Sequence, residues 1–136
     1  MGLYMSIVLR PHKSFDDLVP LTMEVARAVR DAVQQFTGIE GELKWPNDVL
    51  LNGRKVSGIL LETVSRASGP TPLIVGIGVN LRGTRDLFPL ELRDTATTLE
   101  AESGRAPSRE EWIAGALPLL EKRYLDFLNR TERVAS

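Results

Sequence analysis

Hydrophobic residues follow two different periods along this chain, and these periods predict where strands and helices lie. Residues 3–10 are mostly apolar or β-branched and end before Pro11, which has no amide proton to donate to a neighbouring strand. Residues 42–45 form a short β-like segment, and residues 73–81 form a longer apolar run. These three segments predict strands.

A helical period follows the first of these strands. Apolar residues recur every three or four positions from Leu18 to Phe36, which predicts an amphipathic helix. We expect Asp17 to cap its start and Pro20 to lie in its first turn, where a missing amide proton costs nothing. Gly38 is expected to end the helix in a left-handed conformation.

A second helix is predicted near the C-terminal end. Ser108 and Glu111 have the spacing of a capping box, and the apolar side of the helix that they open begins at Trp112. Residues 131–136 are expected to form a loose tail. The pattern therefore predicts a single domain over residues 1–130.

Composition narrows the class of protein. The chain has 136 residues, no cysteine, 17 basic and 18 acidic residues, a formal net charge of -1 and 43% hydrophobic residues, which is ordinary for one soluble globular domain. This balance disfavours nucleic-acid binding by charge alone, and the longest apolar run is far shorter than a membrane span. The absence of cysteine excludes disulfides and fits the cytoplasm, which is the expected location.

A tight hairpin is the strongest local prediction. The dipeptide Asn52-Gly53 separates two apolar runs, the second extending to residue 64, and this pattern is typical of a type I′ turn. Such a turn sets the register of the strands. The expected pairs are Leu51 with Arg54, Leu50 with Lys55, Val49 with Val56 and Asp48 with Ser57.

This register places Asp48, Leu50, Lys55 and Ser57 on one side of the sheet. Two interpretations of the Asp48 and Lys55 pair are open: an exposed ion pair of little energetic value, or two groups on either side of a small ligand. The aromatic ring, rigid turn and amide of the segment Trp45-Pro46-Asn47, just upstream, favour the ligand site.

Alternating glycines mark a second candidate feature. Gly76 and Gly78 share a strand face with Asn80, so this face is expected to form a bare groove that ends in an amide. Gly58 lies in the middle of the strand before it. Close packing of the sheet against a helix is the alternative explanation for these glycines.

Three segments together resemble the catalytic domain of the biotin protein ligase family. They are Lys44-Trp45-Pro46-Asn47-Asp48, then Gly53-Arg54-Lys55-Val56-Ser57-Gly58-Ile59-Leu60-Leu61-Glu62, and later Gly76-Ile77-Gly78-Val79-Asn80. The resemblance covers nearly the whole chain. It implies an α+β fold with a mixed or antiparallel sheet packed on one side by helices, as in class II synthetase-like domains.

The resemblance also implies an activity and a set of site residues. The family joins biotin to ATP to make biotinoyl-AMP, then transfers biotin to a lysine of a carboxylase carrier domain. By motif, the catalytic residues are Lys55, which also contacts biotin, and Asp48. The implied biotin wall consists of Gly58, Leu60, Gly76 and Gly78, and the implied nucleotide contacts are Lys44, Asn47 and Asn80. Mg²⁺ is implied by ATP, with no ligands assigned.

One family feature has no counterpart here. The family carries a Gly/Arg-rich loop, G-R-G-R-x-G-R, before the strand that starts at Gly2-Leu3-Tyr4, so we expect this chain to begin partway through the catalytic domain. Two outcomes stay open: the chain is active by itself, or it is inactive unless the loop is supplied. A homodimer through an open sheet edge is also expected. The alternatives are a non-catalytic biotin-binding or interaction remnant of the fold and a lipoate ligase-like protein.

Overall fold

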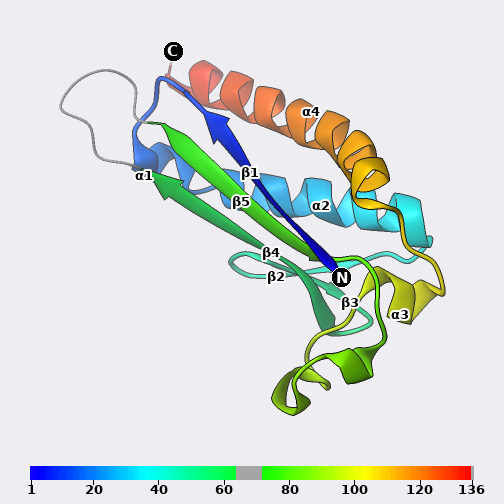
Figure 1. Ribbon diagram of the computed structural model, residues 1–136. Helices are drawn as coiled ribbons and strands as arrows, with labels where there is room; N and C mark the ends of the chain where they lie inside the picture. The colour runs from blue at the N-terminus through cyan, green and yellow to red at the C-terminus, as the bar shows by residue number, and fades with distance from the viewer. Residues whose placement is uncertain (64–71, 136) are drawn as a thin grey trace.

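The computed structural model describes residues 1–63 and 72–135, with side chains up to residue 130. Its centre is an antiparallel five-stranded sheet in the order β1-β5-β4-β3-β2. The strands are β1 (Gly2–Leu9), β2 (Glu42–Lys44), β3 (Asp48–Leu51), β4 (Arg54–Thr63) and β5 (Leu73–Asn80). The long helices α2 and α4 cover one face of the sheet (Figure 1), so the fold is α+β as predicted.

The helices are α1 (Phe15–Leu18), α2 (Leu21–Thr37), α3 (Leu99–Ser103) and α4 (Arg109–Ala135), and residues Arg85–Leu87 and Leu90–Leu92 form two 3₁₀ turns, η1 and η2. The loop predicted at residues 65–71 lies outside the described residues. Helix α3 has no counterpart among the predicted elements. Within the described part of the chain, no helix is long and apolar enough to cross a membrane.

Strand β5 shows why the sheet has two different faces. Leu73, Val75, Ile77 and Val79 are buried against the helices, whereas the alternate residues point to the opposite face. Period-two alternation of this kind places every second side chain on the same face. The predicted separation of the glycines from the apolar residues is therefore confirmed.

The β3–β4 hairpin confirms the turn and corrects part of the register. Asn52 and Gly53 have φ of 52° and 80°, as a type I′ turn requires. The pairs Leu51–Arg54 and Leu50–Lys55 are as predicted, but a β-bulge follows, so Val49 pairs with Ser57 and Asp48 pairs with Gly58.

The bulge has a physical reason in the core. Val56 and Ser57 are adjacent, yet both are buried, at 0% and 2% exposure. An extra residue in one strand allows this, because it shifts the alternation of that strand by one position. The prediction that Ser57 shares a face with Asp48 is therefore wrong. The Ser57 hydroxyl instead donates to the Gly78 carbonyl at 2.6 Å.

The first helical region is divided at Pro20. Ser14, rather than the predicted Asp17, caps α1, because its hydroxyl accepts from the backbone nitrogen of Asp17 at 3.3 Å. Helix α2 begins only at Leu21, since a proline ring clashes with the carbonyl four residues before it. Gly38 ends α2 with φ of 75°, which confirms that prediction.

Helix α4 begins as predicted but ends later. The Ser108 backbone nitrogen donates to Glu111, and the Glu111 backbone nitrogen donates to the Ser108 hydroxyl, both at 3.1 Å, so the capping box is confirmed. The tail predicted at residues 131–136 is wrong as far as Ala135, where the helix ends. No glycine or proline interrupts this stretch, so the helix propagates through it.

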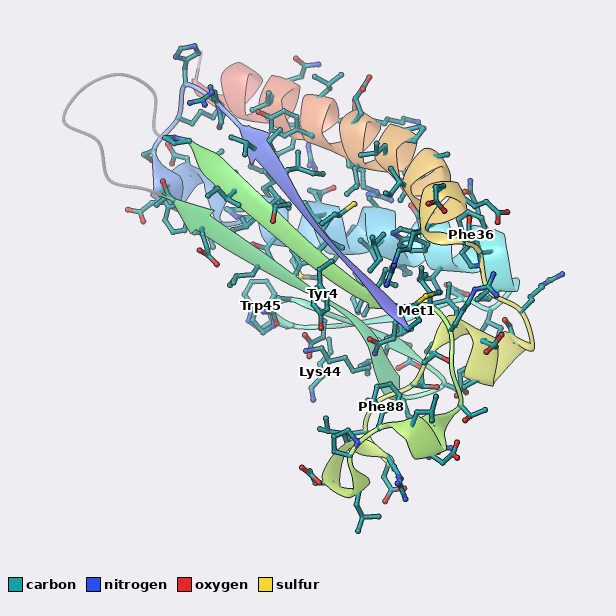
Figure 2. The ribbon with its side chains drawn as sticks, viewed as in Figure 1. Met1, Tyr4, Phe36, Lys44, Trp45 and Phe88 are labelled. Atoms are coloured by element: carbon teal, nitrogen blue, oxygen red, sulfur yellow. The ribbon has the colours of Figure 1, made fainter. Side chains whose placement is uncertain are left out.

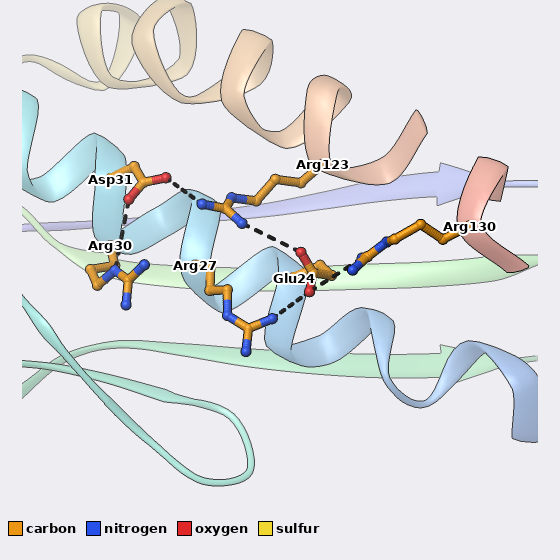
Figure 3. Close-up of polar contacts among 6 residues, drawn as sticks. All are labelled: Glu24, Arg27, Arg30, Asp31, Arg123 and Arg130. Atoms are coloured by element: carbon orange, nitrogen blue, oxygen red, sulfur yellow. Dashed lines mark hydrogen bonds and ion pairs between the residues drawn. The ribbon is translucent and has the colours of Figure 1, made fainter. Parts of the chain in front are cut away.

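An ionic cluster joins α2 to α4 (Figure 3). Glu24 is nearly buried and forms ion pairs with Arg27, Arg123 and Arg130. Arg123 also donates to Asp31 at 2.8 Å. Partial burial acts against the charge of Arg123, but the hydrogen bond to Asp31 and the two nearby carboxylates raise its pKa above the ordinary value.

We expect Arg123→Ala to lower the free energy of unfolding by about 2 kcal/mol. The substitution leaves Glu24 with less compensation in a nearly buried position, and this costs more than losing an exposed ion pair. Urea unfolding measures the change. Lys122→Ala, at the preceding and exposed position of α4, is the matched control. Equal losses of unfolding free energy in the two variants would contradict a special role for the cluster.

Candidate active site

An open cavity of about 900 Å³ is lined by Gly76, Gly78 and Asn80, which lie on the face of β5 opposite its buried side chains. It extends over β3, β4 and β5 and reaches the segment after η2. Every residue that the sequence singles out as a site residue lines it: Lys44, Asn47, Asp48, Lys55, Gly58, Leu60, Gly76, Gly78 and Asn80. The structure thus brings together residues from three separate parts of the sequence.

The two charged groups of the hairpin meet over a glycine. Lys55 Nζ lies 3.3 Å from Asp48 Oδ1, with the lysine side chain 51% exposed and the aspartate 22%. A Cβ at Gly58 would lie 3.2 Å from Lys55 Cε and Nζ and 3.7 Å from Asp48 Oδ1. The lysine reaches the carboxylate across the strand because Gly58 has no side chain.

The backbone of Lys55 is held from the outside of the hairpin. Its amide donates to the Thr95 carbonyl at 2.8 Å, and its carbonyl accepts from the Thr97 amide at 2.9 Å. Residues 94–96, together with Phe88 and Leu92, also line the cavity. Sequence reasoning missed this wall because residues 82–98 show no helical or strand period.

The glycine face of β5 is less bare than predicted. Gly76 is open, since a Cβ there would make only ordinary contacts with Leu60, at 3.6 Å and beyond. Gly78 is covered, since its Cβ would lie 2.9 Å from the ring of Tyr4. Tyr4 comes from β1, pairs directly with Gly78 and is 88% exposed over the sheet (Figure 2). The predicted empty groove is therefore wrong at Gly78.

The predicted nucleotide contacts line the same cavity as the ion pair. Asn80 donates from Nδ2 to the Thr97 carbonyl at 3.1 Å, and the Asn47 carbonyl accepts from the Ile59 amide at 2.9 Å. Lys44 is exposed, and its backbone lies opposite that of Asp48 in the register of β2 and β3. Trp45 is 71% exposed and is not part of the cavity lining (Figure 2).

An ammonium group, a carboxylate and the two asparagines Asn47 and Asn80 thus line one cavity over glycine-containing strands, and this is the candidate site for a small ligand. The family model described as the biotin/lipoate A/B protein ligase family matches residues 1–80, so the chain belongs to this family. Family membership and the α+β fold thus confirm the resemblance and the fold class that the motifs around Asp48 and Lys55 imply.

Individual relatives give the same result. The chain is 39% identical over 127 residues to the bifunctional ligase/repressor BirA of Bacillus spizizenii, covering 93% of this chain and 39% of that protein. It is 40% identical over 111 residues to the biotin--[acetyl-CoA-carboxylase] ligase of Paracoccus denitrificans, covering 79% and 46%. This chain therefore spans less than half the length of either relative.

Solved structures show the same fold. Biotin protein ligase from Aquifex aeolicus in complex with biotin and ATP superposes with a TM-score of 0.80 at 37% identity, covering 94% of this chain and 52% of that chain. A biotin protein ligase-like protein of unknown function from Silicibacter, 17% identical, superposes with a TM-score of 0.70 and supports the fold alone.

Proposed function

We propose that this domain catalyses ATP-dependent biotinylation of a carrier-protein lysine through biotinoyl-AMP. The observation that carries the proposal is the Lys55–Asp48 pair, held over Gly58 inside a cavity of about 900 Å³. Two relatives support it by name: one is a ligase for acetyl-CoA carboxylase, and the other is a biotin protein ligase in complex with biotin and ATP.

In the first step, a carboxylate oxygen of biotin attacks the α-phosphorus of ATP. A new oxygen–phosphorus bond forms, the bond from the α-phosphorus to the bridging oxygen breaks, and pyrophosphate leaves. Negative charge builds up where the carboxylate meets the phosphate. Lys55, paired with Asp48, is the cation that we assign to stabilise this charge. A charged group already oriented by the protein does this better than water, because its surroundings need not reorganise.

In the second step, the amine of the carrier lysine attacks the acyl carbon of biotinoyl-AMP, an amide forms and AMP leaves. The amine must first lose a proton to be nucleophilic. Asp48 is the carboxylate that we assign to accept this proton or orient the amine. Its ion pair with Lys55, the cation proposed for the first step, supports this role.

The remaining roles are those that the family motif implies, and the lining of the cavity supports them. Gly58, Leu60, Gly76 and Gly78, the last of them beneath the Tyr4 ring, form the wall for the apolar rings of biotin, while Lys44, Asn47 and Asn80 contact the nucleotide. Mg²⁺ enters with the phosphates of ATP. In the described part of the chain, no three His, Cys, Asp or Glu residues cluster around a metal position, so we assign no protein ligands.

The experiment combines the purified chain, biotin, Mg-ATP and a biotin carboxyl carrier domain. We expect pyrophosphate release that depends on biotin, followed by biotin on the carrier lysine. Neither product, even at high concentrations of the chain, would exclude activity of this chain by itself. Calorimetric titrations with biotin and with lipoate separate the ligand classes, and tighter binding of lipoate would overturn the assignment to biotin.

We also propose a homodimer, formed through β1. Among the described residues, this strand has β5 as its one strand neighbour, so its other edge has no strand partner, and only at its start does a side chain, that of Arg109, donate to the carbonyl of Gly2. Sedimentation equilibrium tests this proposal, and a monomer at all concentrations contradicts it. The cytoplasmic location stays a prediction.

A further inference from the structure

Thr97 connects the main parts of the cavity from a position that is 0% exposed. Its amide donates to the Lys55 carbonyl at 2.9 Å, and its own carbonyl accepts from Asn80 Nδ2 at 3.1 Å. Its hydroxyl donates to Glu102 Oε2 at 2.5 Å. One buried residue therefore contacts both the backbone of Lys55, whose ammonium group is proposed for adenylation, and the side-chain amide of Asn80, which is proposed for the nucleotide.

Glu102, in α3, connects this residue to the hairpin turn. Its second carboxylate oxygen, Oε1, accepts from Asn52 Nδ2 at 2.8 Å. Asn52 is the first residue of the turn that leads into Lys55, and it holds φ of 52°. The turn before Lys55 and the segment beside Lys55 are thus both bonded to one carboxylate, that of Glu102, which does not line the cavity.

Helix α3 is itself fixed in place, so it can act as a rigid support. The Thr98 hydroxyl caps it by accepting from the Ala101 amide at 2.9 Å, and the same hydroxyl donates to the Gly83 carbonyl at 2.6 Å. The Glu100 amide donates to the Leu81 carbonyl at 3.0 Å. These bonds join α3 to the chain that leaves β5 just after Asn80.

We propose that Glu102 is a positioning residue for Lys55 and Asn80. It holds Thr97 and Asn52 together and thereby fixes the ammonium group and the amide relative to each other across the cavity. Without its carboxylate, the buried Thr97 hydroxyl loses its acceptor, and a buried donor without a partner is costly, so the segment 95–97 shifts. The consequence for adenylation rests on the proposed function, whereas the mechanical link does not.

The charge state of Glu102 fits this role at neutral pH. Partial burial acts against the carboxylate, but the hydrogen bonds from Thr97 and Asn52, with the charges of Arg54 and Arg85, lower its pKa below the ordinary value of 4.5. A group with a depressed folded pKa contributes stability above its unfolded pKa and loses that contribution as the pH falls through the folded pKa. The network is therefore intact at neutral pH and weakens only in acid.

The test measures amide hydrogen exchange by NMR in the whole chain, with Glu102→Ala, Glu102→Gln and the control Glu121→Gln, which changes an exposed residue of α4. In Glu102→Ala we expect the Lys55 and Thr97 amides to exchange about tenfold faster, the size expected for losing a hydrogen bond to a charged group. Glu102→Gln keeps one acceptor oxygen, so its exchange rates are expected to lie between those of the wild type and Glu102→Ala. The control is expected to exchange at the wild-type rates.

A kinetic measurement separates positioning from a purely structural role. We expect Glu102→Ala to raise KM for ATP, through Asn80, and to lower kcat, through Lys55, each about tenfold, while most of the protein stays folded at the assay temperature.

Two results would overturn the inference: unchanged exchange at Lys55 and Thr97 in the alanine variant, or faster exchange that extends equally to Ile77 in the middle of β5. If the wild-type chain makes no biotinoyl-AMP, the proposed function fails, but the inference about Glu102 does not, since the exchange data still test its connection to Lys55 and Thr97.

Discussion

Lys55→Ala is expected to slow biotinoyl-AMP formation by about 10²–10³-fold, because it removes a fixed charge from the place where negative charge develops. The side chain is 51% exposed and its ion pair with Asp48 is at the surface of the cavity, so the fold should lose little stability. Pyrophosphate release under single-turnover conditions measures the effect. Biotin affinity, measured by calorimetry, is expected to fall as well.

Lys122→Ala provides the matched control, since it removes an exposed lysine from α4, on the other side of the sheet. It is expected to leave both measurements unchanged. A Lys55→Ala variant that adenylates biotin at the wild-type rate contradicts the role given to Lys55. Weak biotin binding that is the same in Lys55→Ala and the wild type would instead favour a non-catalytic remnant of the fold.

Gly58→Val is expected to reduce adenylation by about 10²-fold, the loss that a displacement of about 1 Å can cause. Even a Cβ at this position would lie 3.2 Å from Lys55 Cε and Nζ, so a branched side chain displaces the lysine from Asp48. The lysine tip is flexible and valine favours strands, so the fold should tolerate the change. Thermal unfolding and the adenylation rate together measure the two effects.

Gly58→Ala is the graded comparison, because its methyl group requires the lysine to move by only a few tenths of an ångström. We expect its rate to lie between those of the wild type and Gly58→Val. Full activity in the valine variant would show that the path of Lys55 over Gly58 is not needed. A large loss of stability in either variant would instead indicate crowding within the sheet.

Local chemistry made part of this site predictable. The left-handed turn at Asn52-Gly53 depends on the conformational freedom of its own two residues, so the dipeptide predicts it. Gly76 and Asn80 lie on the same face of the sheet because side chains alternate along a single strand. In both cases neighbouring residues in the sequence contain the information, and no distant contact is needed.

The features of the site that the sequence did not predict depend on contacts beyond the neighbouring residues. The bulge at Val56 and Ser57 arises because two adjacent residues are buried, which neither the turn nor the alternation indicates. The position of Tyr4 over Gly78 depends on the pairing of β1 with β5, about 70 residues apart. The contacts of Thr97 with Lys55 come from a segment without any regular period.

The layered arrangement has a practical consequence for engineering. The ion pairs around Glu24 lie between the helices on one side of the sheet, whereas Lys55 and its neighbours lie on the other side. Substitutions that are far apart and share no partner usually add in their free energies. The helical layer can therefore be redesigned for thermal robustness while the ligand-facing surface is tuned separately for a new acid or acceptor protein.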